Sequence, residues 1–270
     1  MRTRWFRPAP RGRRAMLWWL VPGLVAAGAL PMPAAAQRFG VNGGEALTAP
    51  PSPPYDGRFT YARIRFTQTC CVEGGQYWDV KWGHDYPRSD RHFPRILQEL
   101  TTMRVRSDVS AILTLDDPQL FKFPFAYLCE PGYWMPSDKE VAGLRQYLLR
   151  GGFLIVDDFV GNHWYNFETQ IHRAFPEAQL IPLTADHPIF DSFYRIPSLD
   201  FDHPYYRGLK AQFYGLFEDN DPKKRMMAIV NYDYDVSEYW EFSDIGLFPI
   251  DLSNEAYKLG VNYVIYSMSR

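Results

Sequence analysis

The sequence predicts an α/β domain with a mostly parallel central sheet. Patterns typical of strands and of amphipathic helices alternate between residues 58 and 270, as in proteins built from β-α-β units. Residues 153–156 form an uninterrupted apolar run, which is typical of a strand covered on both faces. A helix pattern that ends at Gly151 and Gly152 leads directly into this strand. Together, these three observations define the fold class.

The helix before this strand has a clear beginning and end. Ser137 and Glu140 have the spacing of a capping box, in which each side chain bonds a free amide of the first turn. An apolar face follows at helical spacing, formed by Val141, Leu144, Tyr147 and Leu148. The helix is expected to end at Gly151, because glycine readily adopts the left-handed conformation of a C-terminal cap.

The other elements are assigned from the same kinds of pattern. In the first half they are a strand at 59–66, a helix capped by Ser89 or Asp90 that runs to about Thr102, a short strand at 103–106, an apolar segment at 109–115 and a buried strand at 123–128. In the second half they are a helix at 162–175, strands at 179–183, 212–217 and 226–232, a helical turn at 187–190 and a last helix capped by Ser253.

Residues 1–36 have the three parts of a secretory signal peptide. Six arginines and no acid precede an apolar stretch at 15–30, and three alanines at 34–36 form a cleavage site. The apolar stretch is interrupted by proline and glycine and is short for a membrane span, which favours cleavage over retention. We therefore expect a periplasmic or secreted protein that begins at Gln37. An arginine pair at 13–14 leaves the twin-arginine and general secretion routes both open.

Cleavage would leave an acidic protein with a linker at its start. The sequence has 29 basic and 31 acidic residues, and without the six leader arginines the balance is 23 to 31, a net charge of −8. This charge argues against nucleic acid or an anionic membrane surface as the partner. Residues 37–57 are rich in proline and glycine, so we expect an extended linker without a core of its own. Residues 58–270 then form a single domain.

The three cysteines are Cys70, Cys71 and Cys129. In an oxidising compartment they allow one bridge and one free thiol. A bridge from Cys129 to either member of the adjacent pair fits the sequence, and adjacency leaves that choice open. A catalytic role for Cys129 at a strand end is the alternative, but no small-residue elbow motif accompanies it.

Five blocks, at residues 59–66, 123–127, 144–158, 186–190 and 255–262, resemble domain-of-unknown-function family 4159. The resemblance covers about residues 58–270 and implies a three-layer flavodoxin-like domain, similar to class I glutamine amidotransferases and trehalose-utilisation-type folds. It implies no activity. Amidotransferases of that fold need a cysteine nucleophile on a strand-to-helix elbow with a histidine and an acid. The strand end at Asp157 and Asp158 offers no thiol, so glutaminase activity is not expected.

Acidic residues near predicted strand ends are the candidate site. They are Asp85, Asp116 with Asp117, and Asp157 with Asp158. In an open α/β sheet, ligands bind at the carboxyl ends of the strands. Carboxylates there can transfer protons, bind a hard cation or accept hydrogen bonds from sugar hydroxyls. The alternative is that each caps a helix or turn, which is favoured for Asp116 and stays open for Asp157 and Asp158.

Metal and cofactor signals are weak. His84, His163, His187 and His203 lie near acids or aromatic residues, but no two of them have the spacing of zinc ligands. If an ion is bound, we expect oxygen ligands centred on Asp157 and Asp158. No cofactor is identified, because neither a phosphate-binding glycine loop nor a nucleotide fingerprint occurs.

Trp134 and Trp164 are candidate ligand-binding residues together with these acids. Aromatic rings beside carboxylates are typical of sugar-binding clefts, whereas packing over the sheet ends is the alternative. We expect a non-catalytic binding or interaction module of the cell envelope, with an envelope protein or a glycan-like ligand as partner. The competing hypothesis is a carbohydrate-active or other hydrolase that uses the strand-end aspartates. Nucleic acid binding is not expected, nor is a membrane span after signal cleavage.

Overall fold

The computed structural model describes residues 43–73 and 76–269. The expected signal peptide at residues 1–36 and the first part of the expected linker lie outside the described residues. None of the helices in the described part is long and apolar enough to cross a membrane.

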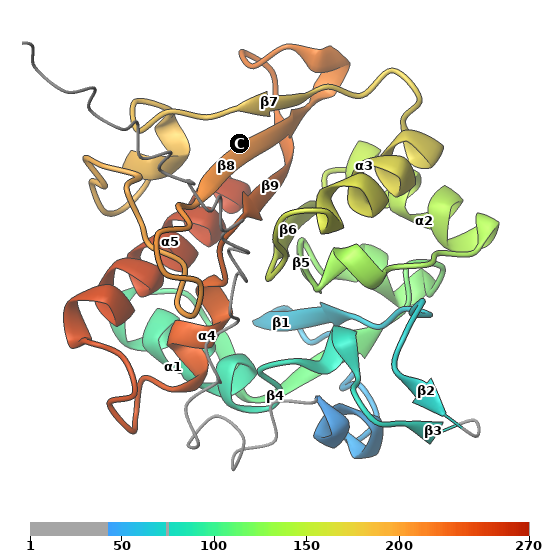
Figure 1. The fold of residues 1–270 in the computed structure, drawn as a ribbon, viewed down its shortest axis with the longest axis horizontal. Coiled ribbons are helices and arrows are strands. Elements are labelled where there is room, and N and C mark those ends of the chain that lie inside the picture. Colours follow the sequence, from blue (N-terminus) through green and yellow to red (C-terminus); the bar gives the residue numbers. More distant parts are fainter. Residues whose placement is uncertain (1–42, 74–75, 270) are drawn as a thin grey trace, which may run out of the picture. The chain divides into compact units, whose positions relative to one another are not determined.

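A seven-stranded sheet forms the centre of the domain (Figure 1). Five strands are parallel, namely β4 (Val105–Leu113), β1 (Phe59–Ile64), β5 (Phe125–Cys129), β6 (Phe153–Asp157) and β9 (Met226–Tyr232). Next across the sheet, β8 (Gln212–Phe217) pairs antiparallel with β9, and β7 (Leu180–Pro182) pairs antiparallel with β8. The spatial order is β4-β1-β5-β6-β9-β8-β7. The predicted α/β class with a mostly parallel sheet is therefore confirmed.

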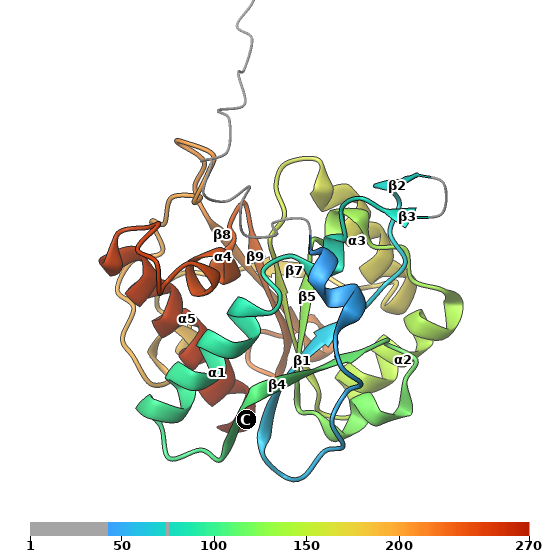
Figure 2. The same ribbon diagram turned by 90° about the horizontal axis from the view of Figure 1, so that it is seen from below.

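Helices cover both faces of this sheet (Figure 2). One face carries α1 (Arg88–Leu100), α4 (Val236–Glu241) and α5 (Ile250–Ser269), and the other carries α2 (Asp138–Leu149) and α3 (His163–Ala174). Each face has its own hydrophobic core, and strand β6 contributes to both. Ile155 belongs to the core on the side of α1, α4 and α5, and Val156 belongs to the core on the side of α2 and α3. The prediction that residues 153–156 form a strand buried on both faces is confirmed.

Several other predictions are confirmed in detail. The capping box of Ser137 and Glu140 is present at the start of α2, and Gly151 follows that helix with a φ of 104°. The strands at 212–217 and 226–232 have the predicted bounds. Short 3₁₀ turns connect the larger elements: η2 (Gly44–Thr48), η3 (Lys81–Gly83), η4 (Pro118–Lys122), η5 (Pro131–Tyr133), η6 (Pro188–Asp191) and η7 (Glu218–Asn220).

The beginnings of two helices differ from the prediction. Helix α1 starts at Arg88 after Pro87, so Ser89 and Asp90 lie inside its first turn and do not cap it. Asp90 instead faces a buried arginine, described below. Helix α5 starts at Ile250, which places Ser253 inside the helix and buries it. In α1, a tertiary partner thus uses a residue whose type suits a cap.

Four further elements, among them a small hairpin, were not predicted or were divided wrongly. The segment at 103–115 contains one strand, β4, rather than a short strand followed by a separate apolar segment. Strands β2 (Val72–Glu73) and β3 (Gln76–Tyr77) form a small antiparallel hairpin. Helix α4 has only six residues, which is too short for an apolar periodicity to be recognised.

The expected linker packs on the domain where the structure describes it. Ala46 is buried in the core. The Ser52 hydroxyl donates to the carbonyl oxygen of Ile112 and accepts from its amide, both at 2.8 Å. This pairing satisfies backbone groups on the outer edge of β4, so these residues of the expected linker pack against the domain.

The cysteines pair differently from the expected arrangement. Cys70 and Cys71 are bonded to each other, and Cys129 is free and buried. Cys129 is the last residue of β5 and belongs to the core on the α1 face. A bridge from Cys129 to the pair, which the sequence allowed, is therefore wrong.

The direction of winding reverses between β1 and β5. From β1 the chain crosses through α1 to β4 on one side, and it then continues through β5 and β6 on the other side. In open α/β sheets such a switch point opens a crevice at the carboxyl ends of the strands, where ligands bind. The loops after β1, β5 and β6 meet there.

A buried arginine in β1 fixes the first of these loops. The guanidinium of Arg63 is fully buried and bonds the carboxylate of Asp90, at 2.5 Å in its shortest contact. The Nη1 nitrogen of Arg63 donates to the carbonyl oxygens of Trp82 and His84 at 3.1 and 2.9 Å. A single planar group thus joins β1, helix α1 and the loop that carries His84.

We predict that Arg63→Met destabilises the domain strongly. The variant keeps the apolar volume but leaves the Asp90 carboxylate and two carbonyl oxygens buried without their donor. Removing one partner of a buried ion pair costs about 3 to 5 kcal/mol, which urea unfolding would measure. Arg58→Met is the matched control, because Arg58 pairs with Asp56 at the surface. Equal unfolding midpoints for the two variants would contradict the role given to Arg63.

Candidate functional site

Acidic residues in left-handed conformations follow three neighbouring strands. Glu130 comes after β5 with φ 48°, Asp158 after β6 with φ 59°, and Asp233 after β9 with φ 54°. Asp85, in the loop after β1, has φ 63°. This conformation is uncommon for residues other than glycine and turns the chain sharply. As a result, acidic residues are concentrated at the carboxyl ends of these strands.

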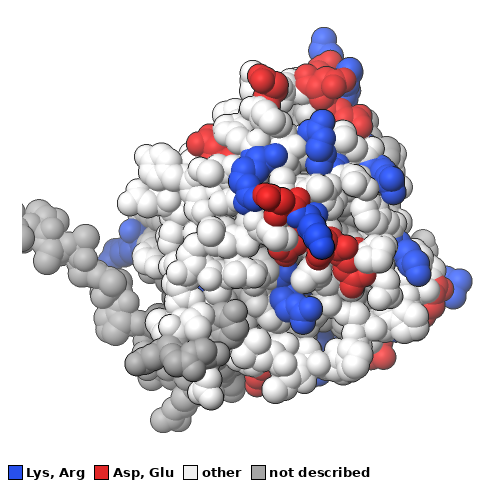
Figure 3. Space-filling view, turned by 90° about the vertical axis from the view of Figure 1, so that its right-hand side faces the viewer, with Lys and Arg blue, Asp and Glu red and all other residues white. Residues whose placement is uncertain are grey.

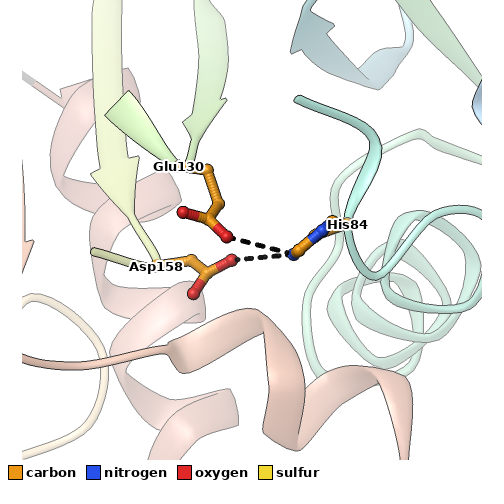
Figure 4. A group of neighbouring side chains, drawn as sticks. All are labelled: His84, Glu130 and Asp158. Atoms are coloured by element: carbon orange, nitrogen blue, oxygen red, sulfur yellow. Dashed lines mark ion pairs between the residues drawn. The ribbon is translucent and has the colours of Figure 1, made fainter. Parts of the chain in front are cut away.

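His84 lies between two of these carboxylates (Figure 4). Its Nδ1 is 3.3 Å from Oε1 of Glu130 and 3.6 Å from Oδ2 of Asp158. On the other side of the ring, Nε2 is 2.7 Å from Oδ1 of Asp79. Both ring nitrogens therefore face carboxylate oxygens.

Lys81 completes this group, which we call the His84 cluster (Asp79, Lys81, His84, Glu130 and Asp158). The Lys81 ammonium is 2.9 Å from Asp79 and 3.1 Å from Glu130. The side chains of the cluster are between 10% and 18% exposed, so solvent and small molecules reach them while most of their surface is protected.

The pKa values of the cluster move in different directions. Burial favours the neutral imidazole, but the hydrogen bonds with Asp158 and Asp79 prevail and raise the pKa of His84 to about 10. Burial and the charge of Asp158 raise the pKa of Glu130 to about 7. For Asp158, burial is outweighed by the bond and the charge of His84, which lower its pKa. Near neutral pH the cluster thus contains an imidazolium, a charged aspartate and a glutamate that exchanges its proton.

A second acidic group lies deeper and contains Asp85, Asp235, Glu238 and Glu241. All four side chains are buried, and Asp85 accepts a hydrogen bond from the Ser237 hydroxyl at 2.5 Å. Asp235 caps α4 by accepting from the amide of Glu238. Burial raises the pKa of each of these acids, that of Glu241 to about 9. The raised pKa values favour the protonated forms in this inner group, which limits the repulsion between its carboxyl groups.

Asp157 is adjacent in sequence to Asp158 but faces another direction. Its carboxylate accepts from Asn231 and Tyr127, each at 2.9 Å, and from the amides of Val236 and Ser237 at the start of α4. Burial raises the pKa of Asp157 to about 7, although Asn231 and Tyr127 donate to its charged form. Both oxygens are engaged, so Asp157 anchors α4 to β6.

Cys129 does not have the environment of a nucleophile. Its thiol is buried and lies 3.4 Å from Oδ2 of Asp158. Burial, together with the charges of Asp158 and Asp85, raises the pKa of Cys129. Because the thiolate is the reactive form of cysteine, this thiol is held in its unreactive state.

The structure brings together only part of the site expected from the sequence. Asp158 lies in the His84 cluster and Asp85 lies directly behind it, whereas Asp157 is turned toward α4. Trp134 is fully buried in the core, and Trp164 packs against Tyr214 and Tyr232 at ring distances of 4.7 and 4.9 Å. The ring of Trp134 is therefore not exposed to a ligand, whereas Trp164 is only partly buried.

Asp116 and Asp117 make local interactions, as the alternative interpretation held. Asp116 accepts from the Thr114 hydroxyl, and Asp117 accepts from the amide of Gln119 at the start of η4. The three residues of the cluster that sequence reasoning missed are Asp79, Lys81 and Glu130. Only Glu130 had a recognisable signal, since an acid directly after a buried strand was the criterion applied to Asp157 and Asp158.

Charges of both signs are interspersed on the face that Figure 3 shows, which carries α2 and α3. Pairs such as Arg173 with Asp138 account for this pattern. A nucleic-acid surface typically gathers Lys and Arg on one face. The face in Figure 3 does not have this character.

The chain belongs to the family described as a domain of unknown function, DUF4159. The family model matches residues 69–268, which include the His84 cluster and all strands except β1. A search of curated proteins found no match. The family assignment confirms the resemblance inferred from the sequence blocks, and it adds no activity.

We predict that Asp157→Asn lowers the free energy of unfolding by about 1 to 3 kcal/mol, because an amide group would face donors that now meet an oxygen. The measurement is urea unfolding at about pH 8, where the native carboxylate is ionised. Asp116→Asn, at an exposed acid, serves as the control and should leave stability unchanged. An unchanged or raised stability of Asp157→Asn would contradict the anchoring role.

The second prediction concerns His203, whose Nδ1 accepts from the amides of Tyr205 and Tyr206. Burial lowers the pKa of His203 to about 4, below the unfolded value of about 6.5. Between these values the unfolded chain binds a proton that the folded chain does not bind, so stability falls as the pH decreases from about 6.5 to about 4. The loss attributable to this group is at most about 3 kcal/mol.

His203→Asn tests this linkage, because an amide oxygen can accept from the same amides and does not titrate. The stability difference between the natural chain and the variant should change over this pH window and stay constant above it. A difference that is constant from pH 4 to pH 8 would show that His203 does not remain neutral on folding.

Proposed function

We propose that this protein is an exported, non-catalytic binding module of the cell envelope with a flavodoxin-like, three-layer domain of the glutamine amidotransferase type. The leader at residues 1–36 supports export. Helices on both faces of the sheet and the switch point between β1 and β5 support the fold assignment. The buried thiol of Cys129, with its raised pKa, argues against the amidotransferase reaction.

The ligand site in this proposal is the His84 cluster. The observation that carries it is the convergence of Glu130 and Asp158, from two adjacent strand ends, on one partly exposed imidazolium (Figure 4). Maintaining left-handed backbone at acidic residues is costly and is common at functional sites. The arrangement offers charged acceptors together with the donors of Lys81, at a depth where water competes less.

A glycan-like ligand fits this combination best. Sugar hydroxyls donate to carboxylates and accept from ammonium groups, and aromatic faces stack on the ring. Tyr133 lies next to the cluster, with the Lys81 ammonium 4.6 Å from its ring centre and the His163 ring 4.7 Å away. These rings take the role that the sequence assigned to Trp134 and Trp164.

A hydrolase that uses two carboxyl groups is the second candidate. It is favoured by one observation: the pKa of Glu130 is raised to about 7 and that of its neighbour Asp158 is lowered. Neighbouring acids with separated pKa values are the pattern of a general acid with a charged partner.

One experiment tests both candidates. The full chain is expressed, the exported protein is recovered, and mass spectrometry should find its N-terminus at Gln37. An array of glycans and peptidoglycan fragments is then screened for binding and for turnover. We expect binding without turnover, reduced at least about 10-fold by Asp158→Asn and by Glu130→Gln, because hydrogen bonds to charged groups are lost.

Asp116→Asn is the control and should bind as the natural chain does. Turnover that Asp158→Asn abolishes would replace the binding module by the hydrolase. Binding that persists in both cluster variants would place the ligand elsewhere. An uncleaved leader in a membrane fraction would refute export with cleavage.

A further inference from the structure

We propose that His84, Glu130 and Asp158 bind a divalent transition-metal ion of the zinc type. The inference goes beyond the proposed function and does not depend on a glycan ligand. It starts from the donor set: one imidazole nitrogen and two carboxylate oxygens, all within 4.8 Å of one another. Imidazole with carboxylates suits zinc and related ions, and three protein ligands with one open position are typical of accessible zinc sites.

The distances in the cluster fit a tetrahedral ion. Zinc binds nitrogen and oxygen at about 2.0 to 2.2 Å, so two of its ligands lie about 3.4 Å apart. From Nδ1 of His84 to the oxygens of Glu130 and Asp158 the distances are 3.3 and 3.6 Å (Figure 4). Two of the three distances between donors thus match a tetrahedral ion, and the ligand atoms of Glu130 and Asp158 lie within 4.8 Å of each other.

The outer contacts of two of the three ligands, His84 and Asp158, are those of a metal site. A metal-binding histidine usually donates its second N–H to a carboxylate, which fixes the ring and its tautomer. Here Nε2 of His84 is 2.7 Å from Asp79, and Asp79 is itself held by Lys81. The ligating oxygen of Asp158 has the thiol of Cys129 at 3.4 Å. His84 and Asp158 are therefore each oriented from behind, while the Lys81 ammonium lies 3.1 Å from the proposed ligand oxygen of Glu130.

The charges also match. With a neutral imidazole, the carboxylates of Asp79, Glu130 and Asp158 and the ammonium of Lys81 leave two negative charges, which one divalent ion neutralises. Without an ion, a proton on Nδ1 of His84 fills the same position and neutralises only one of them. The cluster side chains are 10% to 18% exposed, so an ion has access and a water molecule can occupy the fourth position.

The deeper group of Asp85, Asp235 and Glu238 is the competing location. Its oxygens also lie within 4.8 Å of one another, but all its donors are carboxylates, which suit calcium or magnesium. The three side chains are also buried. The two locations thus differ both in the ion they prefer and in the residues they require.

The test is metal binding by the purified mature chain after treatment with a chelator. Calorimetric titration with zinc should give one ion per chain, and cobalt in its place should give the visible spectrum of a four-coordinate site. His84→Gln and Asp158→Asn should abolish binding. Asp79→Asn should weaken it about 10- to 100-fold, as loss of an outer-shell partner does, and His203→Asn should leave it unchanged.

Each contrary outcome overturns the proposal in a different way. Absence of saturable zinc binding by the folded natural chain refutes the site. Zinc affinity that is unchanged in His84→Gln or in Asp158→Asn assigns the ion to other residues. The same conclusion follows if both variants bind calcium but not zinc. If these variants fail to fold by circular dichroism, X-ray absorption of the natural chain still decides, because an all-oxygen shell without imidazole would contradict the assignment.

Discussion

The buried guanidinium of Arg63 is the constraint on which the site depends. A permanently charged group in the central sheet requires a counter-ion and acceptors for its N–H groups. Asp90 supplies the counter-ion from α1, and the carbonyl oxygens of Trp82 and His84 supply acceptors from the loop. Because the acceptors are backbone atoms, they fix the path of that loop over the strand ends. The position of the His84 ring therefore follows from the electrostatics of a residue in β1.

Acidic residues are crowded at the carboxyl ends of the parallel strands. Their mutual repulsion is limited in one way in the partly exposed His84 cluster and in another way in the buried group behind it. Near the surface, Lys81 and His84 supply positive charge to Glu130 and Asp158. Deeper, burial keeps acids such as Glu241 protonated through raised pKa values. Asp157, between these regions, is satisfied by neutral donors, including two amides at the start of α4. Crowding of like charges is costly for stability, and proteins retain it chiefly where function requires it.

The sequence was most informative where structure is determined locally. The capping box of α2, the apolar run of β6 and the strand-like composition of β8 and β9 are local patterns, and these elements were predicted nearly within their bounds. Asp90 could not be assigned from local sequence, because its role comes from an arginine 27 positions away. Of the His84 cluster, Asp158 was among the residues expected from the sequence, and Glu130 was predictable by the same rule. Lys81 and Asp79 were not, since their loop has no periodicity and is positioned by tertiary contacts.

The end of β5 also explains why carboxylates rather than a thiol dominate the chemistry of this edge. In a nucleophile elbow, the reactive residue occupies the left-handed position after the strand, where its side chain is presented outward. In this chain that position is Glu130, and Cys129 is the preceding residue, still within the strand. Successive residues of a strand face opposite directions, so a shift of one residue leaves the sulfur in the core and presents a carboxylate at the site. A carboxylate beside an imidazole can coordinate an ion, accept hydrogen bonds from hydroxyl groups or transfer a proton. The function of the His84 cluster has to rest on one or more of these properties.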